Sequence, residues 1–339
     1  MNRTKRLTAL VLLAVFSAVL FSGCGTGLPT ALDERATSFA EGKRDMDYTL
    51  EGSRQRLDFL IEHFSGAANE PDIIRGEDGH AAYGNVVVNI LYVASDQDLL
   101  EAFRNAYEAT ATQLRFTYAN GYSATLDQDR LGDLLRQVRR TDPINSIGIR
   151  GWDPNEVDGV QVIDIYYHFS RQELLKIKEQ TPVLVKEIVE QLGTSEQSDY
   201  QKICAVNRYL CENVVYPDPG PNPKRPYPPQ AQIAYYTLKN HSGVCEGYAT
   251  AAALLLREMG IECDIPYGVL NKPDANGNPI KHAWNLVKLH GQWYQMDVTW
   301  NDGASSTEYL LTTDLHMRSS RSWRYSDYEK TPLMRYRGI

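Results

Sequence analysis

The sequence predicts an α+β fold in which a small α/β domain precedes a helix packed on an antiparallel sheet. Strand-like and helix-like apolar patterns alternate between residues 31 and about 170. Further along, residues 246–259 are rich in Ala and Leu and place their larger apolar side chains on one helical face. Two β-rich segments, 282–289 and 292–300, then flank a His-Gly pair typical of a tight hairpin turn.

The N-terminal residues have the pattern of an export signal. Arg3, Lys5 and Arg6 precede a short apolar run that ends in "FSGC", as in a signal peptide over residues 1–23. The ending resembles a bacterial lipobox, with Phe21 where Leu is commonest, and the resemblance implies lipid attachment at Cys24. We expect residues 24–30 to be a tether and the protein to be extracytoplasmic and lipid-anchored to the cell membrane. Ordinary secretion and an uncleaved N-terminal anchor are the alternatives.

Residues 31–190 are expected to form the N-terminal α/β domain, in which no motif indicates a chemistry. Its expected helices cover 31–64, 96–113 and 127–143, a further helix follows Ser170, and its expected strands cover 83–94, 114–119 and 160–169. Residues 191–339 form the second predicted domain, which begins with a helix over about 198–214. A stretch with seven prolines in fifteen residues, 216–230, is expected to be an extended loop of this second domain.

Charge and cysteine content exclude several classes of function. The net charge is −8, and removal of the three basic residues of the signal would change it to −11, so nucleic acid is not expected as a partner. The five cysteines include no close-spaced CxxC or Cys/His cluster, so we expect neither a metal site nor a disulfide framework. No cofactor is expected. The loop 272–281 lacks the acidic twelfth ligand of a calcium loop and is expected to be a mobile hairpin loop close to His282.

Cys245 lies at the start of the predicted helix 246–259 in "SGVCEGYA". The free N–H groups and the positive end of the helix dipole stabilise a thiolate at such a position. Gly243 and Gly247 would leave room for a substrate carbonyl beside the backbone, and the Cys245 N–H could donate to an oxyanion. Glu246 opposes the thiolate by its charge. A lone Cys at a helix start is more often structural than catalytic.

His282 and Asp297 favour a catalytic over a structural role for Cys245. If His290-Gly291 is a two-residue turn, the residue numbers of each hairpin pair sum to 581. Asp297 then lies opposite Trp284 and one diagonal step from His282 on the same face, within reach of a carboxylate–imidazole hydrogen bond. A one-residue register slip would separate the two side chains. A thiol beside an imidazole that an acid orients is the arrangement of Cys-His-Asp nucleophilic catalysis.

The motifs "GVCEGYA", "HAWN" and "DVTWND", in this order, resemble the core of the transglutaminase-like superfamily over about residues 198–315. The resemblance implies a papain-like fold, with Cys245 as nucleophile, His282 as base and Asp297 as orienting acid. It also implies that 308–314 is the strand that closes the sheet. Tyr235 or Tyr236 would supply an upstream oxyanion donor, and Trp284 and Trp300 would line the cleft or support the site.

The expected function is that of an exported thiol enzyme that transfers acyl groups through a thioester. Its substrate would be a protein or peptide, attacked at a glutamine side chain or a peptide bond. An amine acceptor gives crosslinking, and water gives deamidation or proteolysis. The alternatives are a thiol protease and a cell-surface binding or structural module that keeps the fold without turnover.

Overall fold

The computed structural model describes residues 73–75, 81–83, 86–193, 196–217, 227–274, 276–304 and 306–336. The expected signal peptide, Cys24, the tether and the helix over 31–64 lie outside the described residues. The described residues form two compact units: those up to 138 together with 149–171, and 139–148 together with those from 172 onward. The expected boundary between 190 and 191 falls near the end of α6, a helix that lies in the second unit from its second residue onward.

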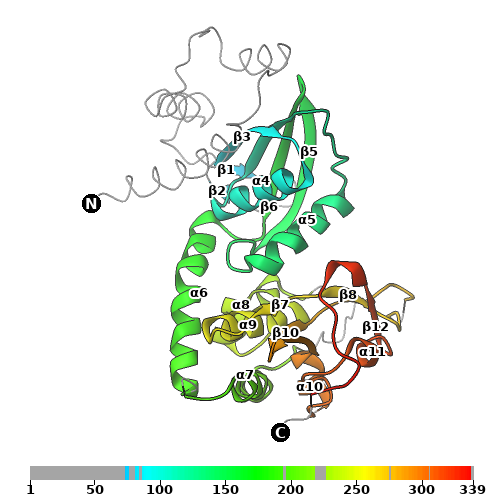
Figure 1. Ribbon diagram of the computed structural model, residues 1–339. Coiled ribbons are helices and arrows are strands. Elements are labelled where there is room, and N and C mark those ends of the chain that lie inside the picture. The colour runs from blue at the N-terminus through cyan, green and yellow to red at the C-terminus, as the bar shows by residue number, and fades with distance from the viewer. Residues whose placement is uncertain are drawn as a thin grey trace. The chain divides into compact units, whose positions relative to one another are not determined.

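The first unit is built on a four-stranded sheet with the strand order β3-β4-β6-β5. β3 and β4 are parallel and are connected through α4, whereas the other pairs are antiparallel. Helices α4 and α5 lie against this sheet (Figure 1). Their residues Leu99, Phe103, Leu131 and Leu134 pack with strand residues such as Ile163 in one buried cluster. The elements are β3 (Val87–Val93), α4 (Asp96–Glu108), β4 (Gln113–Tyr118), α5 (Gln128–Thr141), β5 (Ile149–Val157) and β6 (Val160–Tyr167), with β1 (Ile73–Arg75) and β2 (Ala81–Tyr83) as a separate pair.

β5 is a strand that the sequence pattern did not predict. Its segment reads "IRGWDPNEV" and contains Gly151 beside a register shift and Pro154 in the middle. Both residues are depleted in strands, and Pro is tolerated there at a sheet edge because it cannot donate a ladder hydrogen bond. β5 is the edge strand of its sheet, and that position permits the proline.

Helices of the second unit surround α9 (Cys245–Glu258), whose residues 247–256 are all buried. Tyr248, Ala252 and Leu255 belong to a cluster that also contains Ile203 and Val206 of α7. α7 begins at a capping box in which Ser198 and Gln201 bond each other's backbone. The other helical elements are α6 (Arg171–Leu192), α7 (Asp199–Asn213), η1 (Pro229–Gln232), α8 (Ala234–Asn240), α10 (Val298–Ala304), α11 (Asp314–Met317) and η2 (Tyr325–Asp327).

Two three-stranded antiparallel sheets pack beside these helices, with strand orders β11-β10-β7 and β12-β8-β9. The strands are β7 (Cys263–Asp264), β8 (Tyr267–Leu270), β9 (Lys281–Ala283), β10 (Asn285–Leu289), β11 (Gln292–Met296) and β12 (Arg321–Trp323). The mixed architecture, with a long helix against antiparallel strands, confirms the predicted fold class and is consistent with a papain-like core.

The hairpin turn and its register agree with the prediction. Asn285 pairs with Met296 and Leu289 pairs with Gln292, and both pairs sum to 581. His290 and Gly291 both have positive φ, 50° and 76°, as a type I′ turn requires.

The extent of the hairpin is shorter than predicted. The ladder ends at Met296, residues 298–304 form a helix, and His282 lies on β9, which pairs with β8. The segment 308–314 is also not a strand: only a single bridge, Gln295 to Thr312, continues the ladder.

Candidate active site

Cys245 is the first residue of α9 and is half-buried. The preceding residue, Val244, has extended backbone and offers no capping side chain. No side chain of the N-cap residue bonds the first turn of α9, and the positive end of the helix dipole lies at Cys245. This start agrees with the sequence pattern, and Gly260 with φ +81° follows the end of the helix.

The two glycines beside Cys245 serve packing instead of substrate access. A Cβ on Gly247 would lie 2.4 Å from the Ala231 carbonyl oxygen and 2.3 Å from Thr237 Oγ1. A Cβ on Gly243 would lie 2.6 Å from the same hydroxyl oxygen. The start of α9 therefore presses against η1 and α8, and the absence of two Cβ atoms makes this contact possible.

His282 and Asp297 meet as a buried hydrogen-bonded pair. The imidazole Nε2–H donates to Asp297 Oδ2 at 2.7 Å, and the two side chains are 5% and 0% exposed. The second ring nitrogen is left for Cys245, whose side chain also hydrogen-bonds to the imidazole. The structure thus brings the three predicted residues together, in the order thiol, imidazole, carboxylate.

Asp297 reaches this position as the residue before α10 and not as part of a strand. Its Oδ1 accepts the backbone N–H of Trp300 at 3.1 Å, which is an N-cap interaction. Its own N–H donates to the Tyr309 carbonyl at 2.9 Å. Helix α10 therefore fixes the position of the carboxylate. The Asp297 side chain caps this helix and also accepts the His282 hydrogen bond.

The surroundings of His282 favour the imidazolium. Burial acts to lower its pKa, but the Asp297 carboxylate and the Cys245 sulfur together raise the pKa of His282 to about 9. Burial likewise opposes the charge on Asp297, yet His282 and Arg321 keep the pKa of that carboxyl below its usual value. At neutral pH the site therefore holds a charged imidazole between two groups that can carry negative charge.

Trp284 and Trp300 both contact the His282 ring. Trp284 stacks at 5.8 Å between centroids and is fully buried, with its indole N–H donating to Gln295 Oε1 at 2.6 Å. Trp300 is tilted at 6.1 Å from the same ring and is half-buried. Trp284 thus supports the imidazole from inside the protein, and Trp300 is the one of the two with an exposed surface.

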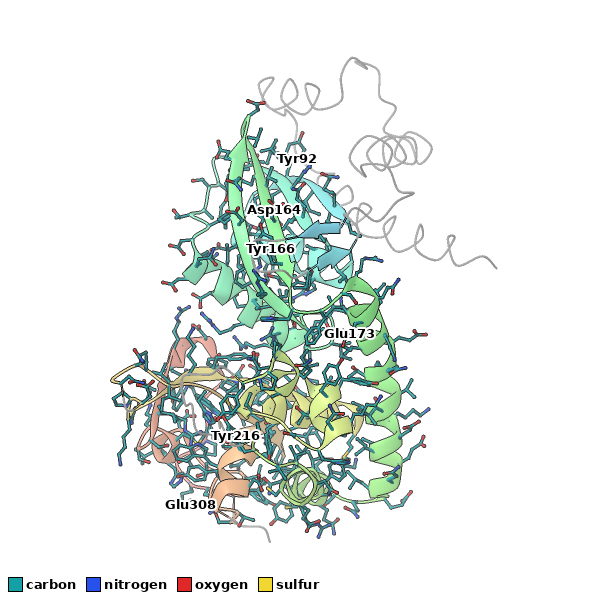
Figure 2. The ribbon with its side chains drawn as sticks, turned by 180° about the vertical axis from the view of Figure 1, so that it is seen from behind. Tyr92, Asp164, Tyr166, Glu173, Tyr216 and Glu308 are labelled. Carbon is teal, nitrogen blue, oxygen red and sulfur yellow. The ribbon has the colours of Figure 1, made fainter. Side chains whose placement is uncertain are left out.

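Tyr235 and Tyr236, the predicted oxyanion candidates, are bonded to α6. The Tyr235 hydroxyl donates to Gln180, and the Tyr236 hydroxyl donates to Glu173 at 2.5 Å. Figure 2 labels Glu173 on that helix. Both predicted tyrosines therefore direct their hydroxyls to acceptors on α6.

Tyr216 is the tyrosine that lies beside Cys245. A parallel bridge between Val215 and Ser242 places it against the loop before α9. The backbone N–H of Cys245 hydrogen-bonds to its hydroxyl, and burial together with the Cys245 sulfur raises the pKa of Tyr216. Its position at the first residue of the proline-rich stretch 216–230 gave no sequence signal, because only the bridge links it to the nucleophile.

Glu246 is paired with a cation and is not a free charge next to the nucleophile. Its carboxylate forms an ion pair with Arg139 and accepts a hydrogen bond from the Tyr267 hydroxyl at 3.4 Å. Arg139 belongs to the segment 139–148 of the same unit and also donates to the Ser146 carbonyl. The repulsion expected from Glu246 is therefore compensated by a residue more than one hundred positions upstream.

The remaining described cysteines, Cys204, Cys211 and Cys263, are free thiols. Burial raises the pKa of Cys211 and of Cys263 to about 12 in each case, which makes these two poor nucleophiles at neutral pH. Over the described part of the chain, no group of three His, Cys, Asp or Glu side chains is arranged to hold a metal ion. Within the same residues, no helix combines the length and apolarity needed to cross a membrane.

Comparison with known proteins shows which families and structures this part of the chain is similar to. Residues 186–298 match the model of the transglutaminase-like superfamily. The kyphoscoliosis peptidase of Mus musculus is 27% identical over 138 residues, which are 39% of this chain and 20% of that protein. The Homo sapiens protein of the same name is 27% identical over 127 residues, 36% of this chain and 19% of the relative. The match therefore spans about a fifth of the length of these relatives.

Among solved structures, similarity is found to a TGase, with 12% identity, a TM-score of 0.29 and coverage of 80% of this chain and 77% of that one. A candidate cysteine protease from Cytophaga hutchinsonii is 15% identical with a TM-score of 0.23, covering 44% and 61% of the two chains. The family match includes Cys245 and His282 and ends one residue after Asp297. The region of this chain that holds the three site residues is therefore similar to the transglutaminase-like superfamily.

Proposed function

We propose that the second unit is a thiol enzyme that transfers acyl groups through a thioester on Cys245. One observation supports this most directly: the His282 imidazole lies between the Cys245 sulfur and the buried Asp297 carboxylate. An acid that fixes the imidazole tautomer, and an imidazole that takes the thiol proton, are the requirements of an activated cysteine nucleophile.

In the first half-reaction the Cys245 thiolate attacks the carbonyl carbon of an amide, and a C–S bond forms. The tetrahedral intermediate collapses when the C–N bond breaks, and the His282 imidazolium gives its proton to the leaving amine. The products are an acyl thioester on Cys245 and a free amine or ammonia. Asp297 keeps the same hydrogen bond to Nε2 throughout and stabilises the imidazolium before the proton is given.

Tyr216 and the Cys245 N–H are the proposed donors to the oxyanion. They already hydrogen-bond to each other, so both lie where the carbonyl oxygen of a substrate attacked by Cys245 would develop negative charge. A phenol with a raised pKa keeps its proton and can donate it in a hydrogen bond at neutral pH. Tyr216 thereby takes the role that the resemblance assigned to an upstream aromatic residue.

In the second half-reaction an acceptor attacks the thioester and restores the thiolate, with His282 removing the acceptor's proton. A primary amine as acceptor gives crosslinking, whereas water gives deamidation of a glutamine side chain or cleavage of a peptide bond. The substrate class that we propose is a protein or peptide, consistent with the superfamily match.

Alkylation by iodoacetamide tests the proposed thiolate without knowledge of the substrate. We expect Cys245 to be alkylated below pH 7 much faster than Cys211 and Cys263, which are internal controls because burial raises their pKa values to about 12. His282→Ala should remove this advantage. Labelling of Cys245 no faster than these two in the wild-type protein would contradict the proposal and favour a binding module without turnover.

The fate of the thioester is tested separately by incubation of a cell-envelope protein extract with a biotinylated primary amine. Incorporation that depends on Cys245 supports transfer to amines. New peptide termini or deamidated glutamines that depend on Cys245, without incorporated amine, support hydrolysis.

We also propose that residues 1–23 direct export and that Cys24 carries the lipid anchor, with the N-terminal domain over 31–190 between anchor and enzyme. The basic, apolar and small-residue order of residues 1–24 supports this. Mass spectrometry of the mature N-terminus tests it: a diacylglycerol-modified Cys24 is expected, and an intact Met1 would contradict it.

A further inference from the structure

Arg321 is a fully buried cation next to the proposed site. It lies on β12, 23 residues beyond the end of the family match, and its side chain is 0% exposed. Its Nη1 donates to Asp297 Oδ2, the same oxygen that accepts the His282 hydrogen bond. The three donors to the Asp297 carboxylate are thus His282, Arg321 and the Trp300 backbone.

Aromatic rings enclose the guanidinium. Its carbon lies 4.1 Å from the centre of the Trp300 ring and 5.3 Å from the centres of Trp284 and Tyr309. Trp300 and Trp284 are also the rings that contact His282. Imidazole and guanidinium therefore share one carboxylate oxygen and two indole rings.

The buried Arg321–Asp297 ion pair is not well explained by a contribution to folding stability alone. The Nη2 group of Arg321 is buried without a hydrogen-bond partner among the described residues. An unsatisfied buried donor destabilises the folded state, and a buried ion pair often adds no net stability over an apolar pair of the same volume. The charge of Arg321 is therefore best explained by what it does to Asp297 and His282.

The sheet fixes Arg321 relative to His282. On the central strand β8, Gly268 pairs with His282 of β9 on one side and with Trp323 of β12 on the other. A Cβ on Gly268 would lie 2.9 Å from the tip of the Trp284 ring. The missing side chain thus leaves room for the indole that contacts both charged groups.

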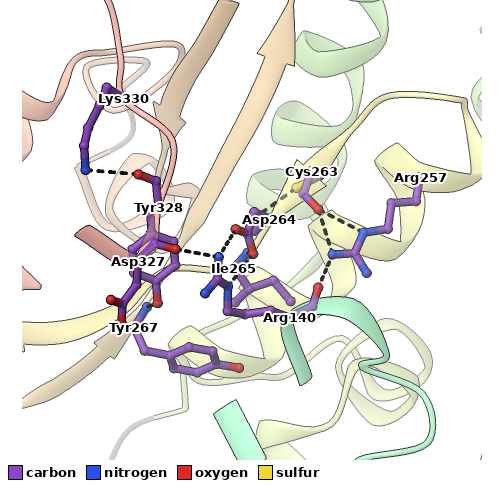
Figure 3. Close-up of polar contacts among 9 residues, drawn as sticks. All are labelled: Arg140, Arg257, Cys263, Asp264, Ile265, Tyr267, Asp327, Tyr328 and Lys330. Carbon is purple, nitrogen blue, oxygen red and sulfur yellow. Dashed lines mark hydrogen bonds and ion pairs between the residues drawn. The ribbon is translucent and has the colours of Figure 1, made fainter. Parts of the chain in front are cut away.

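The chain segment after β12 is anchored to the same unit. Arg140 donates to the Asp327 carbonyl at 2.9 Å and forms two hydrogen bonds to Asp264, while the Tyr328 hydroxyl accepts from the Tyr267 N–H at 3.1 Å (Figure 3). β12 is therefore fixed along β8 and also by the residues that follow it.

We propose that Arg321 is a positioning residue of the catalytic site: its guanidinium keeps Asp297 ionised and oriented while His282 gains and loses its proton. The inference rests on the proposed function. With Arg321 present, the resting site alternates thiolate, imidazolium, carboxylate and guanidinium and has no net charge. When the imidazolium has given its proton to the leaving amine, Asp297 still has a buried cationic partner and does not take up a proton itself.

Other titratable groups face this cluster, and the test accounts for them. Cys245 faces His282, Tyr216 lies next to Cys245, and Tyr309 lies against Arg321. Burial first, and nearby negative charge second, raise the pKa values of both tyrosines above their usual range, so neither ionises below pH 9. The His316 ring contacts Tyr309 at 5.1 Å and its Nε2 lies 3.5 Å from Glu308, so His316→Gln is the control for a histidine outside the cluster.

The experiment is the pH profile of Cys245 alkylation by iodoacetamide in the wild-type full-length protein, R321M, R321K and His316→Gln. Removal of the cation in R321M raises the pKa of every group that its field acts on. The rate of Cys245 alkylation, plotted against pH, has an acidic limb and a basic limb. Both limbs should therefore move to higher pH by about one unit or more. R321K keeps the charge but not the planar fork, so it should lower the rate while its limbs stay at the wild-type pH. His316→Gln should match the wild type.

A purely structural role of Arg321 predicts a different result. Loss of folded protein lowers the amplitude of labelling but does not move the limbs, so a folded R321M with wild-type limbs would overturn the proposal. An equal shift in R321K would also overturn it, because the charge is then not the cause. Failure of the proposed function is distinct: the wild-type protein itself would show no enhanced labelling of Cys245.

If R321M does not fold, a measurement on the wild-type protein decides. The side-chain N–H resonances of Arg321 should shift when His282 titrates, because both donors share Asp297 Oδ2. Guanidinium resonances that do not respond at the pH at which the His282 ring resonances change would overturn the proposal.

Discussion

Gly247→Ala is expected to destabilise the second unit because the added methyl group meets backbone. Its Cβ would lie 2.4 Å from the Ala231 carbonyl oxygen, where ordinary contacts begin at 3.4 Å. The start of α9 must therefore move by about 1 Å, and overpacking of this kind costs about 1–3 kcal/mol. Since a carbonyl in a helical turn yields less than a side chain, we expect a value near the upper end, with slower alkylation of Cys245.

Gly243→Ala provides the matched comparison. Its nearest contacts are all atoms of the Thr237 side chain, at 2.6, 2.7 and 3.1 Å. Thr237→Ala removes the two closest of these atoms, so it should restore most of the stability lost in Gly243→Ala. It should not rescue Gly247→Ala, because the Ala231 carbonyl remains.

Urea unfolding followed by tryptophan fluorescence measures these effects, since four of the five tryptophans belong to the second unit and only Trp152 to the first. Gly303→Ala is the control, because no atom lies within 4 Å of its added Cβ. Gly247→Ala as stable as Gly303→Ala, or fully rescued by Thr237→Ala, would refute the packing argument.

Three further predictions concern the charges and rings around the site. Arg139→Met removes the cation paired with Glu246 beside the nucleophile and should slow Cys245 alkylation at pH 7 about tenfold. Adding Glu246→Gln should restore the rate, and no recovery in the double variant would contradict this. Because the pKa of His282 is raised to about 9, its proton stabilises the folded state fully below about pH 6.5, and this stabilisation, up to about 3 kcal/mol, is lost as pH rises through 9. Unfolding free energies measured between pH 6 and 9 should fall more steeply for the wild type than for His282→Gln, and parallel curves would count against it. Trp284→Phe removes the buried N–H donated to Gln295 and should cost about 1–3 kcal/mol, measured by urea unfolding, whereas an unchanged midpoint would show that this hydrogen bond contributes nothing.

Local sequence patterns sufficed for much of the second unit. The Ala/Leu run after Cys245 determines a helix that begins at that residue, and the His290-Gly291 turn determines the register of β10 and β11. That register places Asn285 opposite Met296, so it brings the segments that carry His282 and Asp297 close together, although neither residue belongs to this ladder. These features depend on residues close in sequence, so periodicity and turn chemistry are enough to predict them.

Other features depend on contacts between distant segments. The pairing of β9 with β8, the ion pair of Arg139 with Glu246 and the approach of Arg321 to Asp297 join residues separated by 12 to 107 positions. No local pattern marks such pairs. The capping role of Asp297 was hidden for another reason: "DVTW" has high strand propensity, and the helix that follows is decided by tertiary packing.

The tyrosine that lies beside Cys245 could not be predicted from local sequence either. Tyr235 and Tyr236 are nearer to Cys245 in sequence, but α8 directs both hydroxyls to α6. Tyr216 is farther away and is placed beside the nucleophile by the bridge between Val215 and Ser242. Proximity along the chain was therefore a poor guide to proximity in the site.

The central claim, that Cys245 is a nucleophile activated by His282, is tested most directly by trapping the acyl-enzyme. The protein is mixed with p-nitrophenyl acetate, quenched in acid and digested, and the peptide that contains Cys245 is analysed by mass spectrometry. We predict a burst of p-nitrophenol close to one equivalent of enzyme, an acetyl group on Cys245, and a much slower burst in His282→Ala. A burst that persists in Cys245→Ala, or acetylation confined to other residues, would contradict the account.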